Sequence, residues 1–181
     1  MTEKDILNLI KSDPWMMDAI GKAEKLNLKN WIIGAGFVRN KVWDYLHNIT
    51  SKKTDVDLVY YDINGNNERE DEILTDKLKT ETGINWEIVN EYYAHVWNNF
   101  KPFKSTEDAI STWCETATGV GVTIKDGALK LVMPHGINDL VNLILRPSPA
   151  FMNNIGFVKE RIKNKKWLET WPKLKLSPEL Q

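Results

Sequence analysis

The feature that most constrains this chain is the run of residues 30–62, which predicts a strand, a glycine turn, a helix and a second strand. It begins with NWIIG, whose β-branched residues and final glycine are typical of a short buried strand. After the turn GAGFVRN, the spacing of Val38, Val42 and Tyr45 predicts one buried face of a helix. DVDLVYY then predicts the next strand. This order of elements indicates an α/β fold.

The rest of the chain predicts further elements around that run. Residues 1–28 predict two helices, the second opened by the capping residue Asp13 and a first-turn proline, Pro14. A charged helix, EREDEILTDKLKTET, precedes a third strand, NWEIVN, and TGVGVTIKDGALKLVM is typical of a β-hairpin. Residues 136–171 predict two helical segments, GINDLVNLIL and FMNNIGFVKERIKNKKWLETW, separated by the prolines of RPSP.

Composition excludes several classes of protein. The 181 residues carry a net charge of −1, so the strongly basic character of a dedicated nucleic-acid binder is absent. The single cysteine, Cys114, forms no internal disulfide, which fits a reducing cytoplasm, and three histidines do not supply a structural zinc site. We find neither a signal peptide nor an apolar run that would span a membrane, and we expect no membrane partner. The basic run KERIKNKKW is typical of a solvated helix face, with nucleic-acid contact as the alternative.

Two aspartates, Asp55 and Asp57, alternate with apolar residues at the start of the second strand. Because side chains repeat every two residues along a strand, both project from the same face, with their Cβ atoms about 6.5 Å apart. Carboxylates held this close repel each other unless a cation lies between them, and Mg²⁺ or Mn²⁺ with oxygen ligands is the usual solution. Two such ions support phosphoryl or nucleotidyl transfer. The alternative is a solvated pair that caps a loop.

The glycine turn between the first strand and its helix is a candidate phosphate site. Gly34 and Gly36 permit close approach of the backbone, and the following helix N-terminus offers free N–H groups to a phosphate. A dinucleotide fingerprint would need a glycine at Arg39, and a Walker loop would need Gly-Lys-Ser or Gly-Lys-Thr, so neither motif is present. The alternative is a tight turn that packs the helix on the sheet without a ligand.

The glycine turn, Arg39, the helix and Asp-x-Asp in this order resemble the nucleotidyltransferase superfamily, which includes DNA polymerase β and the tRNA CCA-adding enzymes. AGFVRN is similar to the Gly-Gly-x-Val-Arg-Asp segment of the CCA-adding enzymes, except that Ala35 replaces the first glycine and Asn40 the aspartate. A closer resemblance, over residues 14–176, is to a bacterial branch described only as nucleotidyltransferase-like. It rests on runs similar to GAGFVRNKVWD, TDVDLVYYD, ETATGVGV, GINDL, RPSP and WLETWPKL.

This resemblance implies a fold, a ligand set and a reaction. We expect residues 1–181 to form a single α/β (α+β) domain with a mixed β-sheet, on which helical segments at about residues 1–28 and 136–171 pack. The resemblance implies that Asp55 and Asp57 bind magnesium and that a nucleotide lies in the cleft. Gly34, Gly36, Arg39 and Asn40 are its candidate nucleotide-binding residues.

The superfamily also uses a third carboxylate on a neighbouring strand. Glu87 in NWEIVN is the candidate, with an exposed structural residue as the alternative. Asn90 and His95 fit the pattern of the bacterial branch, and for His95 an ordinary surface or core histidine is the favoured interpretation. Glu115 and Thr116 also resemble a shared motif, and a helix-to-strand turn accounts for them equally well.

Two functions remain after this reading. The first is metal-dependent transfer of a nucleoside monophosphate from an NTP to an unknown small-molecule, protein or RNA acceptor, with release of pyrophosphate. The second is a catalytically silent nucleotide-binding or regulatory module of the same fold. The altered glycine motif and the uncertain third acid keep the second alternative open.

Overall fold

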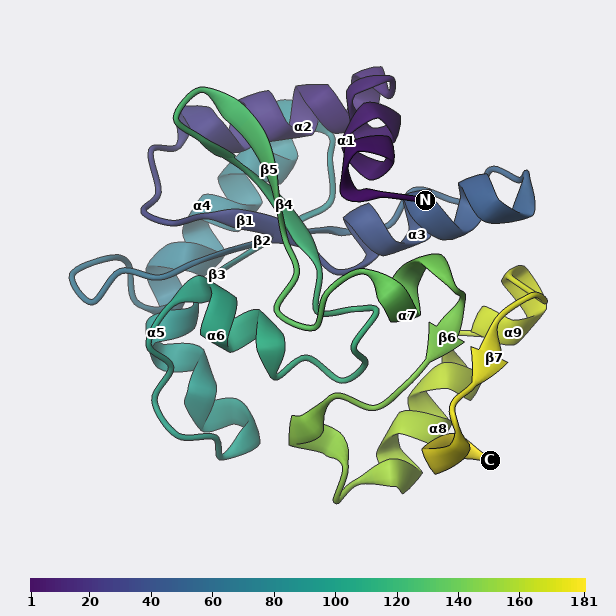
Figure 1. Cartoon of the computed structure of the whole chain (residues 1–181). Helices are drawn as coiled ribbons and strands as arrows, with labels where there is room; N and C mark the ends of the chain where they lie inside the picture. The colour runs from purple at the N-terminus through teal and green to yellow at the C-terminus, as the bar shows by residue number, and fades with distance from the viewer.

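The computed structural model describes the backbone of residues 1–181 and every side chain except that of Asn98. A five-stranded mixed sheet with the order β3-β2-β1-β4-β5 forms its centre (Figure 1). The predicted α/β fold with a mixed sheet is therefore confirmed. The strands are β1 (Ile32–Gly34), β2 (Val56–Tyr60), β3 (Trp86–Asn90), β4 (Gly121–Lys125) and β5 (Ala128–Val132).

The pairing of these strands is antiparallel except at one edge. β1 runs antiparallel to both β2 and β4, whereas β2 and β3 are parallel. β4 and β5 form the predicted hairpin, which turns at Asp126 and Gly127, with φ angles of 53° and 70°. Positive φ at both central turn residues matches the twist of the flanking strands, which is why Asp-Gly is favoured there.

The two faces of β2 and β3 carry different side chains. Val56 and Leu58 of β2 are fully buried in the main core cluster, together with Trp86 of β3. On the opposite face, Val59 and Val89 belong to a separate small cluster. At the parallel edge of the sheet, one face therefore packs in the main core, and the opposite face contacts a different set of residues.

Helices cover the main core face. α1 (Glu3–Lys11) packs against α3 (Gly36–His47) and β5, while α2 (Pro14–Lys25) packs against β4. Asp13 caps α2 as predicted, because its carboxylate accepts hydrogen bonds from the first-turn N–H groups. α4 (Glu68–Thr82) lies along β3.

The buried face of α3 differs from the prediction at one position. Val38 and Val42 are buried as expected, but Tyr45 is 61% exposed, so its predicted burial is wrong. Trp43 takes the interior position instead, because its ring packs edge-on against Trp167 and Trp171 of the C-terminal segment. A contact with a distant segment therefore decided which side of the helix is buried.

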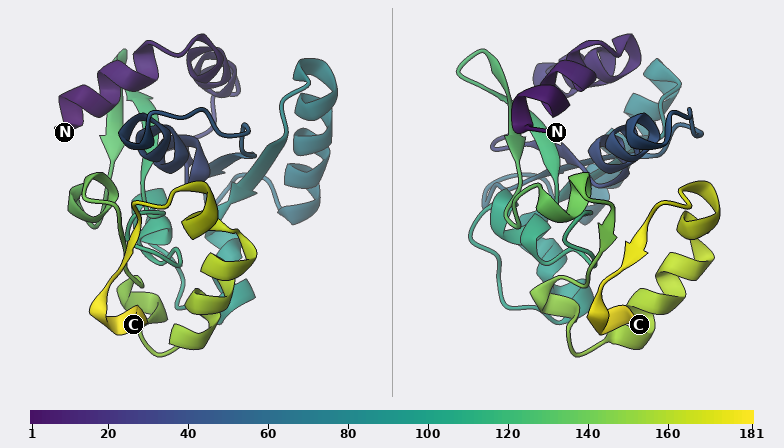
Figure 2. Two further views of the ribbon diagram at one scale, coloured as in Figure 1. Left: turned by 90° about the vertical axis from the view of Figure 1, so that its right-hand side faces the viewer. Right: turned by 45° about the vertical axis from the view of Figure 1, so that its right-hand side comes forward.

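The C-terminal segment packs beside the sheet, on the side of the molecule away from α1 and α2 (Figure 2). The predicted helix over GINDLVNLIL is wrong in its second half: α7 (Asn138–Val141) ends early, and Ile144–Leu145 forms β6. Leu143 adopts a φ of 61°, which no α-helix continues through, and β6 pairs in parallel with β7 (Lys175–Leu176). The other short elements are α5 (Glu91–Ala94), η1 (His95–Asn98), α6 (Thr106–Ser111), η2 (Pro149–Phe151), α8 (Ile155–Asn164), α9 (Trp167–Thr170) and η3 (Pro178–Leu180).

Candidate active site

Asp57 and Glu87 lie side by side on the parallel strands β2 and β3. They are register partners, so both side chains project from the same face of the sheet. Both line a pocket of about 320 Å³ on the face opposite the main core. Glu87 is exposed and Asp57 is half-buried. The structure thus brings the predicted third carboxylate next to one of the two predicted metal ligands.

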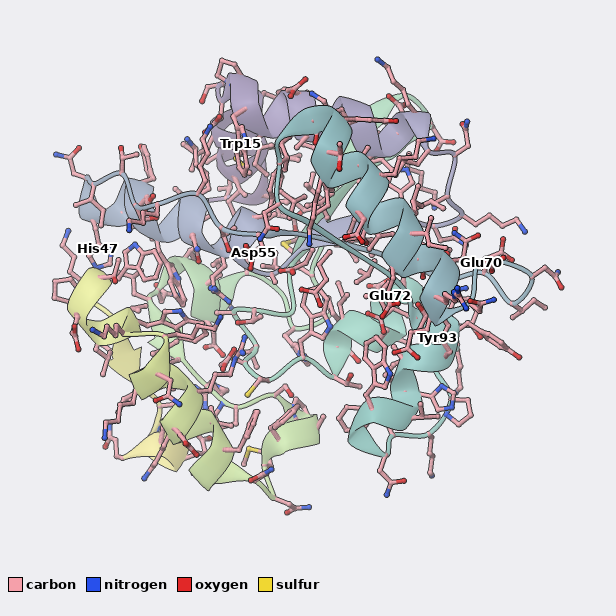
Figure 3. The ribbon with its side chains drawn as sticks, turned by 180° about the vertical axis from the view of Figure 1, so that it is seen from behind. Trp15, His47, Asp55, Glu70, Glu72 and Tyr93 are labelled. Atoms are coloured by element: carbon pink, nitrogen blue, oxygen red, sulfur yellow. The ribbon has the colours of Figure 1, made fainter. Side chains whose placement is uncertain are left out.

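Asp55 lies directly before β2 and is exposed. Its carboxylate accepts a hydrogen bond from the side-chain amide of Asn85, while the backbone N–H of Val56 donates to the Asn85 carbonyl over 2.8 Å. In the rear view Asp55 lies close to the centre of the molecule, with the C-terminal segment below it (Figure 3). Asn85 therefore ties the start of β2 to the start of β3.

The electrostatic environment of Asp57 opposes its charge. Burial, followed by the nearby carboxylates of Glu87 and Asp55, raises the pKa of Asp57 to about 7, although Arg39 and Lys165 act in the opposite direction. A carboxylate at Asp57 with two other carboxyl groups nearby is costly without a compensating cation. The arrangement is typical of residues placed for function.

The donor atoms at this site fit a hard divalent cation. Carboxylate oxygens of Asp55, Asp57 and Glu87 are the ligand type that Mg²⁺ and Mn²⁺ prefer. In the described part of the chain, however, no three acidic, histidine or cysteine side chains are already close enough to enclose an ion. Binding of a cation would therefore include rotation of these side chains, with Asp55 leaving its contact with Asn85.

The glycine turn is tightly packed by protein atoms. A Cβ at Gly34 would lie 2.6 Å from the ring of Trp113, and one at Gly36 would lie 2.7 Å from the Thr54 hydroxyl. Between them, Ala35 adopts φ 51° and ψ −125°, a conformation that residues with a Cβ rarely adopt. Both glycines are required where they stand, and Ala35 holds backbone strain at the edge of the pocket, which it also lines.

Arg39 is only 5% exposed, and its guanidinium is occupied by protein contacts. One NH group donates to the Thr118 hydroxyl over 2.8 Å, and Nε donates to the side-chain oxygen of Asn40 over 3.1 Å. The guanidinium also lies 4.3 Å from the ring centroid of Trp167. Burial lowers the pKa of Arg39 to about 10, and the negative charge of Glu115 opposes that shift.

Glu115 connects Arg39 to the C-terminal segment. Its carboxylate is fully buried and accepts hydrogen bonds from the Thr118 hydroxyl over 2.6 Å and from Arg161 Nε over 3.1 Å. Thr118 and Arg161 both line the pocket that contains Asp57. The ETAT run marked this region in the sequence, but only the structure shows that it links two arginines.

None of the four predicted nucleotide-binding residues lines the pocket of Asp57. Gly36 and Asn40 line a different pocket of about 450 Å³, and Gly34 and Arg39 line neither of the two, although Ala35, between the glycines, lines the Asp57 pocket. The side chain of Asn90 is occupied by structural hydrogen bonds to Asp62 and Asn66. His95 contacts the ring of Phe103 edge-on, and neither Asn90 nor His95 lines the Asp57 pocket.

Sequence reasoning missed several residues of the Asp57 pocket. The most prominent is Glu91, which is 6% exposed, and whose pKa burial raises to about 7. The alternation of Glu87, Val89 and Glu91 in the sequence was a usable signal, because residues two apart share a face of a strand, although β3 itself ends at Asn90 and Glu91 begins α5. Other pocket residues missed from sequence are Phe100, Phe103, Trp113, Phe151, Phe157 and Arg161.

No helix in the described part of the chain is both long and apolar enough to cross a bilayer.

Comparison with known proteins identifies the family. A family model described as Nucleotidyltransferase matches residues 21–176. An NMR structure that reveals a CCA-adding enzyme head domain superposes with a TM-score of 0.87 at 28% identity, covering 97% of this chain and 96% of that chain. No curated protein matches the sequence.

Two longer solved structures share the fold. A CCA-adding enzyme in complex with CTP gives a TM-score of 0.56 at 17% identity and covers 99% of this chain. A Thermotoga maritima CCA-adding enzyme complexed with tRNA gives 0.57 at 16% identity and covers 98%. This chain spans only 44% and 42% of those two chains. The predicted resemblance to nucleotidyltransferases is confirmed, and the chain belongs to the nucleotidyltransferase family.

Proposed function

We propose that this protein transfers a nucleoside monophosphate from an NTP to an acceptor in a reaction that depends on a divalent metal. The observation that carries the proposal is the register pairing of Asp57 with Glu87 on the pocket face of β2 and β3. Asp55 directly precedes β2, and its charge, like that of Glu87, raises the pKa of Asp57. The three carboxyl groups are therefore close enough to interact electrostatically at Asp57.

The three acidic residues have distinct proposed roles. Asp55 and Asp57 would hold Mg²⁺ or Mn²⁺, which when bound supplies charge stabilisation to the phosphates. Glu87 accepts the proton of the acceptor hydroxyl as its oxygen forms a bond to the α-phosphorus. The bond from the α-phosphorus to the bridging oxygen breaks, and pyrophosphate leaves with that electron pair.

The triphosphate is proposed to lie at the turn that joins β1 to α3. Gly34 and Gly36 give this turn its shape, and Arg39 acts on the same side through Thr118, which lines the pocket. Asn40 accepts a hydrogen bond from Arg39 and so positions it. Arg161, which also lines the pocket, adds a second positive charge.

The relatives support a nucleotide substrate and suggest an acceptor class to test. One CCA-adding enzyme of this fold is solved with CTP and another with tRNA. RNA is therefore a candidate acceptor here, beside a small molecule or a protein. We place the reaction in a reducing compartment such as the cytoplasm, which suits the single thiol, Cys114.

We further propose that residues 1–181 act as one domain. A single buried cluster includes Ile10 of α1, Val38 of α3, Leu58 of β2 and Trp167 of α9. Side chains from both terminal segments thus share one core with the sheet, which supports their folding together.

The test is titration of ATP, CTP, GTP and UTP by calorimetry, with and without Mg²⁺, on the wild type and on Asp57→Asn. Asp76→Asn, on an exposed part of α4, is the matched control. We expect Mg²⁺-dependent binding that Asp57→Asn abolishes and Asp76→Asn keeps. Absence of Mg²⁺-dependent binding of any nucleotide would contradict the proposal.

A transfer assay decides between an enzyme and a silent module. An NTP labelled at the α-phosphorus is incubated with the protein and cell extract, and products are treated with ribonuclease or protease. Label that disappears with one treatment identifies the acceptor class. Nucleotide binding without any transfer of label would support the catalytically silent alternative.

A further inference from the structure

The floor of the Asp57 pocket is built by alternate residues of two parallel strands. Asp57 pairs with Glu87, and Val59 pairs with Val89 two residues further along. Glu91 follows at the end of β3, and all five residues line the pocket. Along the strand direction, the floor thus changes from acidic to apolar and then ends at a carboxyl group.

The length of this floor matches the layout of a nucleotide. Glu91 is four residues beyond Glu87, which corresponds to about 13 Å at the rise of an extended strand. A nucleotide whose α-phosphate lies at Asp57 and Glu87 would place its sugar over the valine pair. Its base would then reach the end of the pocket at Glu91.

Aromatic rings line the same pocket. Phe100 lies 6.1 Å from Phe103 and 6.3 Å from Phe151, centroid to centroid, and Phe151 stacks on Phe157 at 5.6 Å. Trp113 belongs to the small cluster that includes Val59 and Val89. Flat aromatic faces stack on bases of any sequence, so these rings provide affinity without selecting one base.

Glu91 is a buried acidic residue of this pocket. It is 6% exposed, and burial alone accounts for the shift in its pKa, with no charged neighbour and no hydrogen bond contributing. In the described part of the chain this carboxyl forms no side-chain hydrogen bond or ion pair, and its oxygens are not among the fully enclosed polar atoms. A polar ligand group in the pocket could therefore reach it and replace the solvation that burial removes.

The backbone that carries Glu91 is fixed by its neighbours. The N–H of Asn90 and the hydroxyl of Tyr93 both donate to the same carboxylate oxygen of Asp71, each over 2.7 Å. Tyr93 lies on α5, directly after β3 (Figure 3). The backbone on both sides of Glu91 is thus fixed by hydrogen bonds, as expected for a residue that recognises a ligand.

We propose that this pocket receives the base of the NTP and that Glu91 accepts a hydrogen bond from the exocyclic amino group of adenine, cytosine or guanine. This inference rests on the proposed function, because it places the α-phosphate at Asp57 and Glu87. A carboxyl group has an accepting oxygen in either protonation state, whereas both exocyclic groups of uracil are acceptors. Glu91 therefore favours the three amino-bearing bases over uracil.

The experiment measures the affinity of ATP, CTP, GTP, UTP and tripolyphosphate in the presence of Mg²⁺, on the wild type, Glu91→Ala and Glu91→Gln. We expect at least one amino-bearing NTP to bind the wild type about tenfold more tightly than UTP, as one hydrogen bond allows. Glu91→Ala should remove that preference and leave the affinities of UTP and tripolyphosphate unchanged. Glu91→Gln, whose amide oxygen still accepts, should keep most of it.

The controls separate this inference from the proposed function. Glu107→Ala, at an exposed position on α6, should leave every affinity unchanged, and circular dichroism checks that each variant is folded. If NTPs bind with Mg²⁺ but Glu91→Ala keeps the base preference, or weakens tripolyphosphate equally, the role of Glu91 is refuted and the proposed function stands. If no NTP binds with Mg²⁺, both are refuted.

Discussion

Asp57 and Glu87 are paired residue by residue across the parallel strands β2 and β3, with their side chains on the pocket face. Burial and the nearby carboxylate of Glu87 both disfavour the negative charge of Asp57, so ionising this residue costs free energy. Two carboxylates that repel each other do not stabilise the fold, so this pairing indicates a functional role for both residues.

Replacing Asp57 should affect metal binding more than folding. Asp57→Asn keeps the shape of the side chain but removes a charge that a divalent cation needs, so Mg²⁺-dependent nucleotide binding should be lost. The metal-free protein should be equally stable or more stable, because the repulsion from Glu87 and Asp55 is relieved. Thermal melts with and without Mg²⁺ and nucleotide check this. A wild type that ignores the metal, together with a less stable variant, would contradict the ligand assignment.

Glu87→Gln should separate catalysis from binding. If Glu87 accepts the acceptor proton, the amide cannot replace it, and kcat should fall by about 100-fold or more while the KM for NTP changes little. Pyrophosphate release with the acceptor identified in extract is the measurement. The exposed Glu107→Gln should retain full activity, and a rise in KM alone for Glu87→Gln would assign it to nucleotide binding instead.

Arg39→Lys should reveal how much of Arg39 is structural. Lysine cannot reproduce the planar stacking on Trp167 together with the bonds to Thr118 and Asn40, so the free energy of unfolding should fall by about 2 kcal/mol. The proposed triphosphate role adds about a tenfold loss of NTP affinity. Urea unfolding and calorimetry measure the two effects, with the exposed Arg69→Lys as control. Unchanged affinity in the folded variant would remove Arg39 from the nucleotide site.

Ala35→Gly should stabilise the protein. Ala35 adopts φ 51° and ψ −125°, which glycine tolerates far better, so the variant should gain about 1 kcal/mol in unfolding free energy. Gly83→Ala is the matched opposite: a Cβ there meets no atom within 4 Å, but φ is 65°, so a loss of about 1 kcal/mol is expected. Equal stability of Ala35→Gly and wild type in urea unfolding would show that the turn carries no strain.

Glu91 should make the protein less stable as pH rises. Its folded-state pKa of about 7 lies above the ordinary value of 4.5, so the folded protein binds more protons than the unfolded chain between these values. Stability is therefore lost as pH rises through this window. Relative to Glu91→Gln, the wild type should lose about 2 kcal/mol between pH 5 and pH 8. Urea unfolding of both proteins at the two pH values measures this, and parallel pH profiles would place the Glu91 carboxyl in water.

Local patterns predicted most of the elements correctly. The strands at Ile32–Gly34, Val56–Tyr60 and Trp86–Asn90 and the β4–β5 hairpin all lie where alternation and turn residues indicated them. The failures came where distant contacts overrode a local pattern. Trp43 rather than Tyr45 is buried on α3 because Trp167 and Trp171 pack on it.

The sequence by itself determined the order of most elements, because helix and strand periodicity depend only on neighbouring residues. It also predicted a shared face for Asp55 and Asp57, but β2 begins at Val56, and Asp57 lines the pocket with Glu87 whereas Asp55 does not. Only the tertiary structure decided that Glu87 is the register partner of Asp57, that Arg39 is buried against Trp167 and that Glu91 lines the same pocket as Asp57. Strand register and burial depend on segments far apart in the chain. No local pattern contains that information, so the sequence predicted the acidic residues of the candidate site but not the residues that line its pocket.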